Sequence, residues 1–339
     1  MNGMKIALLG AMGFVGQTAA RALARCPEVR ELLLVDYNIR ETKKFGKALS
    51  PKCRWAMADV GRAPELVRLL DDVDAVANAV GPCREYEKTV LLTCAGARLP
   101  TASIGDGILS DGDRGEIHDA FRRTGVMAVS GCGILPGWTE LLAAHFLSAP
   151  SEGGRSGAAT EEGGESTAKA NRFLFFSPDR FGGYAFFRRI VREIGGPAPI
   201  PPCAPAGRYF ESGEGTLIGF PEGRQARLGR SITSGLGVFG AVGRELSSAF
   251  LFWLRRSQRS ATGTHAAAAG VFPAKGGKGQ VASISDPDGL VPGTMLAETV
   301  LLLGRDRELP TGLMPLPGIL GRKEAERIAA SCGGEIRVE

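Results

Sequence analysis

Residues 4–16 read Met-Lys-Ile-Ala-Leu-Leu-Gly-Ala-Met-Gly-Phe-Val-Gly. The apolar run over residues 5–9 has the length of a buried parallel strand, and residues 14–25 space their apolar side chains as one face of a helix does. Three glycines separate these two patterns, at Gly10, Gly13 and Gly16. Backbone without side chains can turn sharply and approach a diphosphate, and a helix start presents unpaired amides to it. The order strand, glycine turn and helix therefore predicts a dinucleotide-binding site.

The position of Asp36 supports this interpretation. The glycines follow the pattern G-x-x-G-x-x-G rather than the principal dinucleotide fingerprint, and a bare tight turn also uses glycine, so the context decides. A second apolar run over residues 31–35 ends in Asp36, where dinucleotide-binding folds place a carboxylate on the adenosine ribose hydroxyls. This position favours NAD as the cofactor. The competing interpretation of Asp36 is a solvated residue at a strand end. Arg40, or Asn38 with less charge, could instead contact a 2′-phosphate, so NADP stays open.

Length and composition indicate two domains. The chain has 339 residues, of which 44% are hydrophobic, enough for two cores. Its net charge of +5 comes from 41 basic and 36 acidic residues spread along the chain, which does not indicate nucleic-acid binding. The seven cysteines form no C-x-x-C pair, so we expect reduced thiols in a cytoplasmic protein, without a disulfide framework or a metal site. Glycines interrupt the apolar start, which is interpreted as a strand and not as a signal peptide.

Strand and helix patterns alternate through residue 147. After residue 35 the expected strands cover residues 54–60, 74–80, 101–104 and 126–130, and the expected helices cover residues 64–70, 85–95, 114–123 and 136–147. Such alternation predicts an α/β fold with a Rossmann-type doubly wound parallel sheet. Ligands bind beyond the carboxyl ends of such strands, so the loops at residues 10–16, 81–85 and 131–137 matter most.

The rest of the chain indicates a second unit. Residues 148–169 are rich in Gly, Ser, Glu and Ala, which predicts a flexible linker. Apolar sequence resumes at residue 171, with strands expected within residues 209–220 and at 280–285, a loop at 261–270, and helices at 183–194, 292–303 and 322–331. Residues 246–259 contain aromatic residues followed by basic residues. A core helix, a dimer contact and a membrane-surface helix all fit this pattern, which is too short to span a bilayer.

Three segments resemble the saccharopine dehydrogenase-like oxidoreductases: Gly10-Ala-Met-Gly13-Phe-Val-Gly16, Asn78-Ala-Val-Gly81-Pro82 and Gly131-Cys-Gly133-Ile-Leu-Pro136-Gly137. The likeness covers mainly residues 4–147. It implies an NAD(P)-binding Rossmann domain, an inserted α+β substrate and dimerisation domain, and a C-terminal segment that packs back on the first domain. We accordingly expect these units at residues 1–147, 170–290 and 291–339.

The expected cofactor contacts come from the strand ends and the turns that follow them. Gly81 and Pro82 are expected to carry the chain past the nicotinamide ribose without a bulky side chain in the way. The full expected set is Gly10, Met12, Gly13, Phe14, Val15, Gly16, Asp36, Asn38, Arg40, Asp59, Val80, Gly81 and Pro82.

Hydride transfer also requires a positioned acid beside the reacting carbon. Tyr86 and Lys88 lie at the start of the helix after the second loop and are candidates for proton transfer. For Lys88, a surface position on an amphipathic helix is the competing interpretation. Arg84 is a candidate for binding a substrate carboxylate.

The segment over residues 131–140 is the other candidate for substrate binding. Pro136 suits a first helical turn, and Leu135 before it cannot cap the helix amides, so these amides could bind a carboxylate. Trp138 could form a wall and Cys132 could touch the nicotinamide, although a tight turn lined by core residues, with a buried cysteine, fits equally. The expected substrate-binding residues are Arg84, Cys132, Gly133, Pro136, Gly137, Trp138 and Thr139.

These patterns lead to one main functional hypothesis and two alternatives. The main hypothesis is an NAD(P)-dependent oxidoreductase, acting as a homodimer on a carbon–nitrogen bond of a small amino- or imino-acid-like substrate. The second segment of the resemblance looks closer to enoyl reductases, so reduction of a carbon–carbon double bond on a lipid-like substrate is the first alternative. Family members often carry an aromatic residue and an aspartate where this chain has Leu99 and Thr101, with Asp106 as the candidate substitute. This departure motivates the second alternative, a non-catalytic NAD(P)-binding module.

Overall fold

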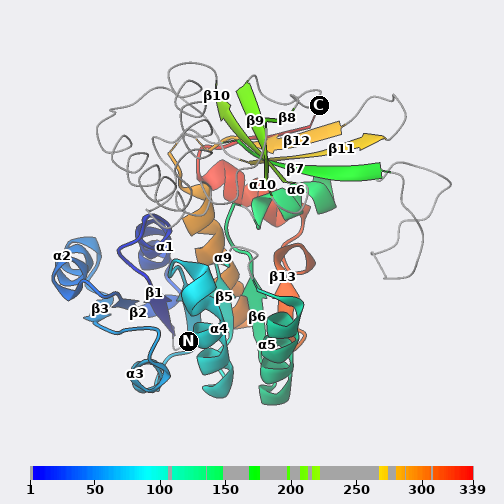
Figure 1. Cartoon of the computed structure of the whole chain (residues 1–339). Helices are drawn as coiled ribbons and strands as arrows, with labels where there is room; N and C mark the ends of the chain where they lie inside the picture. Colours follow the sequence, from blue (N-terminus) through cyan, green and yellow to red (C-terminus); the bar gives the residue numbers. More distant parts are fainter. Residues whose placement is uncertain are drawn as a thin grey trace, which may run out of the picture.

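A computed structural model describes nearly all of the first unit and parts of the second. It covers residues 3–105, 109–134, 136–147, 168–175, 197–198, 207–212, 216–221, 267–273, 280–286, 288–306 and 308–338. The described residues form two seven-stranded sheets, which lie one above the other in Figure 1. The predicted Rossmann-type doubly wound sheet is confirmed as the lower of these two sheets.

The first sheet is parallel throughout. Its strands, in spatial order, are β13 (Gly312–Pro315), β6 (Met127–Ser130), β5 (Thr101–Ser103), β4 (Ala75–Asn78), β1 (Met4–Leu9), β2 (Val29–Val35) and β3 (Cys53–Ala56). The helices packed around it are α1 (Phe14–Arg25), α2 (Ile39–Leu49), α3 (Ala63–Leu69), α4 (Cys83–Gly96), α5 (Asp111–Thr124) and α9 (Val291–Arg305). The chain order reverses direction between β1 and β4, which are neighbours in space.

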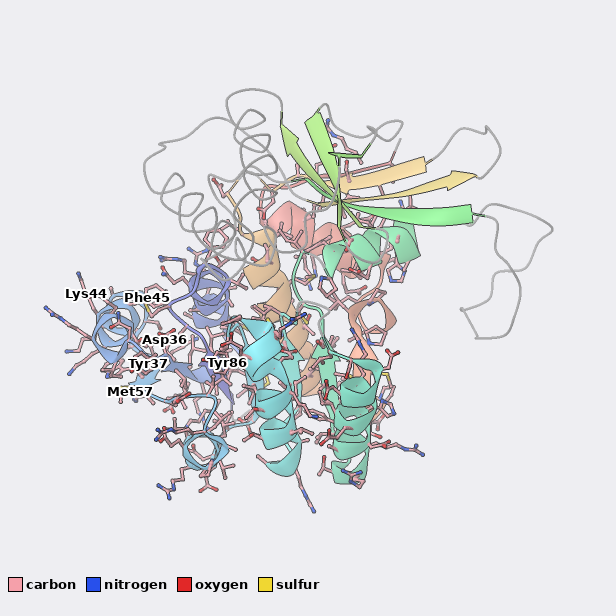
Figure 2. The ribbon with its side chains drawn as sticks, in the orientation of Figure 1. Asp36, Tyr37, Lys44, Phe45, Met57 and Tyr86 are labelled. Atoms are coloured by element: carbon pink, nitrogen blue, oxygen red, sulfur yellow. The ribbon has the colours of Figure 1, made fainter. Side chains whose placement is uncertain are left out.

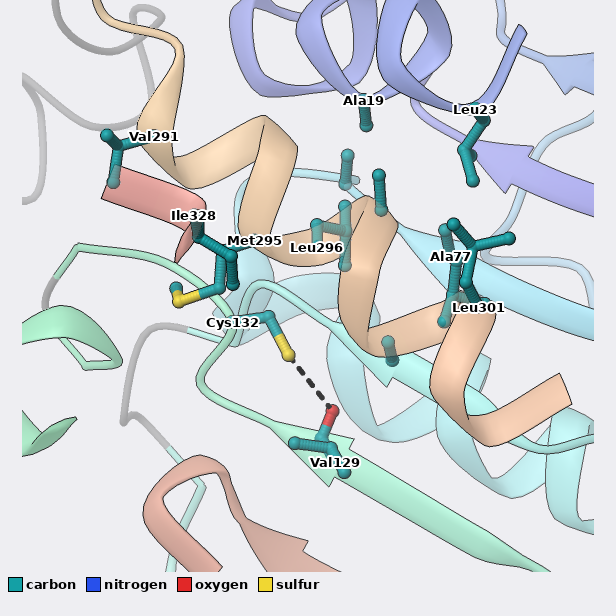
Figure 3. Close-up of a cluster of buried hydrophobic side chains, with 14 of the residues drawn as sticks. Ala19, Leu23, Ala77, Val129, Cys132, Val291, Met295, Leu296, Leu301 and Ile328 are labelled. Atoms are coloured by element: carbon teal, nitrogen blue, oxygen red, sulfur yellow. Dashed lines mark hydrogen bonds between the residues drawn. The ribbon is translucent and has the colours of Figure 1, made fainter. Parts of the chain in front are cut away.

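Alternation along the strands divides the core into two layers. On β1, Ile6 and Leu8 pack in the layer that contains α1 and α9, and Ala7 and Leu9 pack in the layer that contains α3, α4 and α5. Successive strand side chains point to opposite faces, so a strand buried on both faces must be apolar throughout. Figure 3 shows the first layer, with side chains of α1 and α9 meeting those of the strands.

Helix α9 comes from the far end of the sequence and packs on α1, beside β4 and β5. The two helices approach closely at Gly293, where a Cβ atom would lie 2.5 Å from Thr18 Cβ and 2.8 Å from the Ala19 nitrogen. The C-terminal segment thus joins the first sheet twice, through α9 on its face and through β13 at its edge.

The second sheet lies above two helices. Its strands, in spatial order, are β14 (Ile336–Val338), β12 (Gln280–Ile284), β11 (Ala267–Pro273), β7 (Ala168–Phe175), β10 (Thr216–Pro221), β9 (Gly207–Ser212) and β8 (Pro197–Ala198). Helix α6 (Trp138–Phe146) packs on this sheet and on the short 3₁₀ helix η2 (Leu316–Gly318), and α10 (Arg322–Ser331) contacts α6 and α9. In Figure 1, α6 and α10 lie between the two sheets.

Several expected boundaries move. The strand expected over residues 54–60 ends at Ala56, after its last pair with β2. Part of the loop expected at residues 261–270 belongs to β11, because Ala267 and the residues after it pair with β7 and β12. Strand β7 likewise takes the last two residues of the expected linker. Residues 148–167, 183–194 and 246–259 lie outside the described residues. Within the part that is described, no helix is long and apolar enough to cross a membrane.

We predict that the Gly293→Ala substitution lowers the free energy of unfolding by about 1 to 3 kcal/mol, because its methyl group would force α1 and α9 apart. The matched control is Gly115→Ala on α5, where an added Cβ meets no atom within 4 Å. The control is expected to raise stability by up to about 1 kcal/mol, since alanine favours helix. Urea unfolding of the two variants measures the difference, and equal effects would contradict the close helix contact.

Asp286 is a buried carboxyl group at the junction between β12 and α9, only 1% exposed. Its Oδ1 accepts a hydrogen bond from the Leu290 amide at 2.8 Å, and its Oδ2 accepts one from the Val291 amide at 3.1 Å. The carboxyl group therefore holds the first turn of α9. Burial raises its pKa to about 6, although these amide hydrogen bonds act in the opposite direction.

We predict that Asp286 makes stability depend on pH. A carboxyl pKa raised above its unfolded value of about 3.9 favours the folded state below pH ~4, and this contribution is lost as the pH rises through about 6. The difference in unfolding free energy between the wild type and Asp286→Asn should therefore fall by about 2 to 3 kcal/mol from pH 4 to pH 7. Urea unfolding across this range tests it, and a difference that does not vary with pH would refute it.

Candidate functional site

The three predicted loops and the loop after β5 follow four neighbouring parallel strands. We call the loops at residues 10–16, 79–82, 104–105 and 131–137 the carboxyl edge, because they follow β1, β4, β5 and β6. Since β1 and β4 are adjacent but their connections leave in opposite directions, the first two loops flank the point where doubly wound sheets bind ligands.

The glycine turn after β1 packs closely through its backbone at two of its glycines. Gly10 adopts a φ of +73°, and a Cβ atom there would lie 2.7 Å from the Ala79 carbonyl oxygen of the second loop. At Gly16 a Cβ would lie 2.1 Å from the Gly10 carbonyl oxygen. These two contacts leave no room for side chains, so the turn, the helix behind it and the end of β4 are packed through their backbones.

The first turn of α1 has no side-chain cap. Its N-cap residue is Gly13, which makes no side-chain hydrogen bond, and no acidic residue follows in the first turn. The starts of α2 and α5 are different, because the side chains of Asn38 and Ser110 accept hydrogen bonds from their amides. The positive end of α1 is thus available to an anion at the carboxyl edge.

Asp36 stands directly beside the glycine turn. Its Oδ2 accepts a hydrogen bond from the Met12 amide at 2.9 Å, and its Oδ1 accepts one from the Asn38 amide at 3.1 Å. In Figure 2 Asp36 lies between α2 and the start of α4, with the exposed side chains of Tyr37 and Met57 nearby. These hydrogen bonds fix the carboxylate at the end of β2, next to the turn.

Three other predicted cofactor contacts, Asn38, Arg40 and Asp59, follow β2 and β3 along the chain. The Asn38 side chain is used to cap α2 by accepting from the Glu41 amide at 3.3 Å. Arg40 is exposed on α2. Asp59 is exposed too, and its Oδ1 accepts from the Gly61 amide at 3.0 Å.

The second loop leads directly into α4. The Asn78 side-chain oxygen accepts a hydrogen bond from the Val80 amide at 3.2 Å, and the loop then passes through exposed Gly81 and half-buried Pro82. Arg84 follows in the first turn of α4 and is also exposed. The predicted carboxylate binder therefore stands at the carboxyl edge with its side chain in solvent.

Of the proton-transfer candidates, Tyr86 and Lys88 occupy different surroundings. The Tyr86 ring packs beside Gly61, where a Cβ would lie 3.4 Å from Tyr86 Cε1. The Lys88 ammonium contacts Asp113 at 2.5 Å and Glu116 at 2.7 Å, both on α5. These hydrogen bonds raise the pKa of Lys88, which makes it a weaker proton donor near neutral pH. The third candidate, Asp106, lies outside the described residues.

The third loop satisfies its own amides. The Gly137 amide donates to Glu140 Oε2 at 2.5 Å, the Trp138 amide donates to the Gly133 carbonyl, and the Thr139 amide donates to the Ile134 carbonyl. The helix begins at Trp138, so Pro136 precedes it instead of opening its first turn. The expected anion site on free α6 amides is therefore corrected: Glu140 and the loop carbonyls already occupy these donors.

Two of the expected substrate contacts from this loop face the core. Trp138 is 0% exposed and packs within the layer that contains α9. Cys132 is equally buried, with its Sγ donating to the Val129 carbonyl at 3.8 Å (Figure 3). Burial raises the pKa of Cys132 to about 12, so the group is a neutral thiol at physiological pH. Both side chains are thus enclosed in the hydrophobic core.

A buried polar cluster at the carboxyl edge was missed from the sequence. Glu87 is only 2% exposed, and its carboxyl group accepts hydrogen bonds from Asn78, Ser103 and Ser130, the last residues of β4, β5 and β6. A signal existed, since three apolar strands each end in a small polar residue. No pattern along the chain links these residues to one glutamate on α4.

This chain is similar to one protein-family model and to several solved structures. Residues 6–104 match the family model described as the saccharopine dehydrogenase NADP binding domain. Apo histidine-tagged saccharopine dehydrogenase (L-Glu forming) from Saccharomyces cerevisiae is similar in fold, with a TM-score of 0.61 and 12% identity over 99% of each chain. A nucleoside-diphosphate-sugar epimerase from Pseudomonas aeruginosa matches 38% of this chain and 51% of its own, with 21% identity and a TM-score of 0.28. No curated protein matches the sequence.

The matched residues coincide with the geometry described above. They run from β1 to the end of β5 and include the glycine turn, Asp36 and the second loop. The predicted NAD or NADP cofactor is confirmed at the level of the domain. The likeness to the yeast enzyme, at 12% identity, extends the common fold over both sheets.

We predict that Gly13→Val weakens NADH and NADPH binding by about 10-fold or more, because a branched side chain would stand at the open start of α1. Gly13 has an ordinary φ of −65°, and its nearest Cβ neighbour would be the Gly10 carbonyl oxygen at 3.3 Å, so the fold should survive. Fluorescence titration measures binding, with Gly115→Ala as the control. Unchanged affinity would exclude the diphosphate from this helix start.

Proposed function

We propose, from the premise that residues 6–104 are a saccharopine dehydrogenase-like NAD(P)-binding domain, that this protein is an NAD(P)-dependent oxidoreductase. Its reaction would be hydride transfer at a carbon–nitrogen bond of an amino- or imino-acid-like substrate. The observation that carries this proposal is the glycine turn at residues 10–16, where Gly10 packs against the backbone of the loop after β4, within a fold that resembles saccharopine dehydrogenase along its whole length.

The residues present fit a dinucleotide. The uncapped start of α1 offers positive charge to the diphosphate, and Asp36 offers carboxylate oxygens to the ribose hydroxyls. When bound, the cofactor supplies or accepts the hydride. Since Asp36 is held in place by two backbone amides, its fixed negative charge favours hydroxyl groups over a 2′-phosphate. Exposed Arg40 on α2 is the residue that would accommodate the phosphate of NADP.

The chain supplies substrate binding from the start of α4. Arg84 is the cation that follows the second loop, and a guanidinium can hold a carboxylate through two parallel hydrogen bonds. Tyr86, two residues after Arg84 on the same helix, is the proposed proton donor to the substrate nitrogen. Asp106 stays a prediction for the same role. Gly133, Gly137 and Thr139 are the proposed substrate contacts from the third loop.

The proposed assembly is a cytoplasmic homodimer that binds a small-molecule substrate. Support for the cytoplasm comes from the cysteines, because the six that are described are all free thiols. The proposed dimer contact at residues 246–259 lies outside the described residues.

The test of this function is binding followed by turnover. Full-length protein is titrated with NADH and NADPH, and then mixed with each cofactor and a panel of amino acids, 2-oxo acids with amines, and enoyl compounds. We expect oxidation or reduction of the cofactor with the amino- or imino-acid substrates. Turnover with enoyl compounds alone would establish the carbon–carbon reductase instead. Cofactor that binds and is never turned over would establish a non-catalytic module, and absence of binding would refute the proposal.

We predict that Arg84→Ala raises the KM for the carboxylate substrate by about 10- to 100-fold while kcat changes by less than about threefold, as expected when a binding contact alone is lost. The KM of Arg84→Lys should fall between those of the wild type and Arg84→Ala, since lysine keeps the charge but not the paired geometry. The matched control is Arg123→Ala in the last turn of α5. Steady-state kinetics measure these values, and an unchanged KM would exclude Arg84 from substrate binding.

A further inference from the structure

One buried carboxyl group connects three loops of the carboxyl edge. Glu87 Oε2 accepts hydrogen bonds from Asn78 Nδ2 at 3.1 Å and from Ser103 Oγ at 2.7 Å. Glu87 Oε1 accepts one from Ser130 Oγ at 3.1 Å. Asn78 Nδ2 also donates to Ser103 Oγ at 2.9 Å, so the cluster is connected internally as well. Because these residues end β4, β5 and β6, Glu87 ties together the points from which three loops depart.

The connection continues into the loops themselves. The Val80 amide donates to Asn78 Oδ1 at 3.2 Å, which fixes the start of the second loop. The Cys132 amide donates to the Ser103 carbonyl at 2.8 Å, which fixes the start of the third. The orientation of each loop therefore depends on a residue that Glu87 holds.

Gly105 shows how tightly this cluster is packed. A Cβ atom at this position would lie 2.1 Å from Ser130 Oγ, 2.9 Å from Glu87 Oε1 and 3.1 Å from the Gly131 nitrogen. The loop after β5 thus rests directly on the cluster through its backbone. A change in the Glu87 carboxyl group would therefore affect the second and third loops through hydrogen bonds, and the loop after β5 through direct contact.

We propose that Glu87 is a positioning residue, which fixes the loops around the nicotinamide half of the cofactor without touching the adenosine half. This inference rests on the proposed function. The adenosine half belongs to the glycine turn and Asp36, on the β1 and β2 side of the sheet, whereas Glu87 serves β4, β5 and β6. The two halves of one ligand are therefore held by separate sets of residues.

Two substitutions separate the effect of the Glu87 hydrogen bonds from the effect of its side-chain volume. Glu87→Ala leaves Asn78, Ser103 and Ser130 without a shared acceptor in a buried site, where unsatisfied polar groups are costly. Glu87→Gln keeps one acceptor oxygen for Asn78 and Ser103. Its amide can donate to Ser130, whose hydroxyl rotates to accept. The glutamine variant should therefore rescue what the alanine variant loses.

The experiment compares two probes on the full chain. The first is NADH or NADPH, whichever the wild type binds more tightly, and the second is the matching fragment without nicotinamide, ADP-ribose or 2′-phospho-ADP-ribose. Both dissociation constants are measured by calorimetry. For Glu87→Ala we expect the dinucleotide to bind about 10-fold or more weakly and the fragment to bind within about twofold of the wild type. For Glu87→Gln we expect both within about threefold.

Glu65→Gln, which removes a carboxylate on the surface of α3, is the control and should bind both probes as the wild type does. If Glu87→Ala does not fold, Ser130→Ala takes its place, since it removes one hydrogen bond and should weaken the dinucleotide alone by about threefold. Equal losses for both probes, or none for either, would overturn the positioning role and leave the proposed function intact. A wild type that binds neither probe would overturn both.

Discussion

The close approach of three backbone segments at the end of β1 governs the rest of this structure. Gly16 must lack a side chain because the Gly10 carbonyl occupies that space, and Gly10 must lack one because the Ala79 carbonyl does. Together these contacts set the direction of α1, the position of the loop after β4 and the exposure of the helix start. A single methyl group in this place would separate the elements that form the cofactor site.

The same region also joins the two sheets. Helix α9 follows the second sheet, packs on α1 through Gly293, and begins at the turn that Asp286 holds. At Gly289, just before α9, a Cβ atom would lie 2.6 Å from Phe14 Cζ at the start of α1. The junction between the domains thus lies next to the cofactor turn.

Neighbours in sequence have unrelated tasks on α4. Successive helix residues point about 100° apart, so Glu87 faces the ends of three strands while Lys88 faces two carboxylates on α5. From the sequence, Lys88 is a candidate for proton transfer with a surface position as the competing interpretation, and Glu87 carries no prediction. The structure pairs Lys88 with two carboxylates and buries Glu87. Similarly, Glu140 is tied to the third loop only because the backbone there directs the Gly137 amide toward the Glu140 carboxylate.

Features that depend on local order can be predicted from the amino-acid sequence. The glycine turn, the apolar strands, their alternation with helices and the aspartate after β2 follow from spacing along the chain, and they indicate the doubly wound sheet and its cofactor class. Three other features become visible in the folded chain: Cys132 and Trp138 face the core, the α6 amides are occupied, and Glu87 joins three loops. Periodicity shows which residues share an element, whereas contacts between residues as distant as Asn78, Glu87 and Ser130 exist only once the strands are aligned.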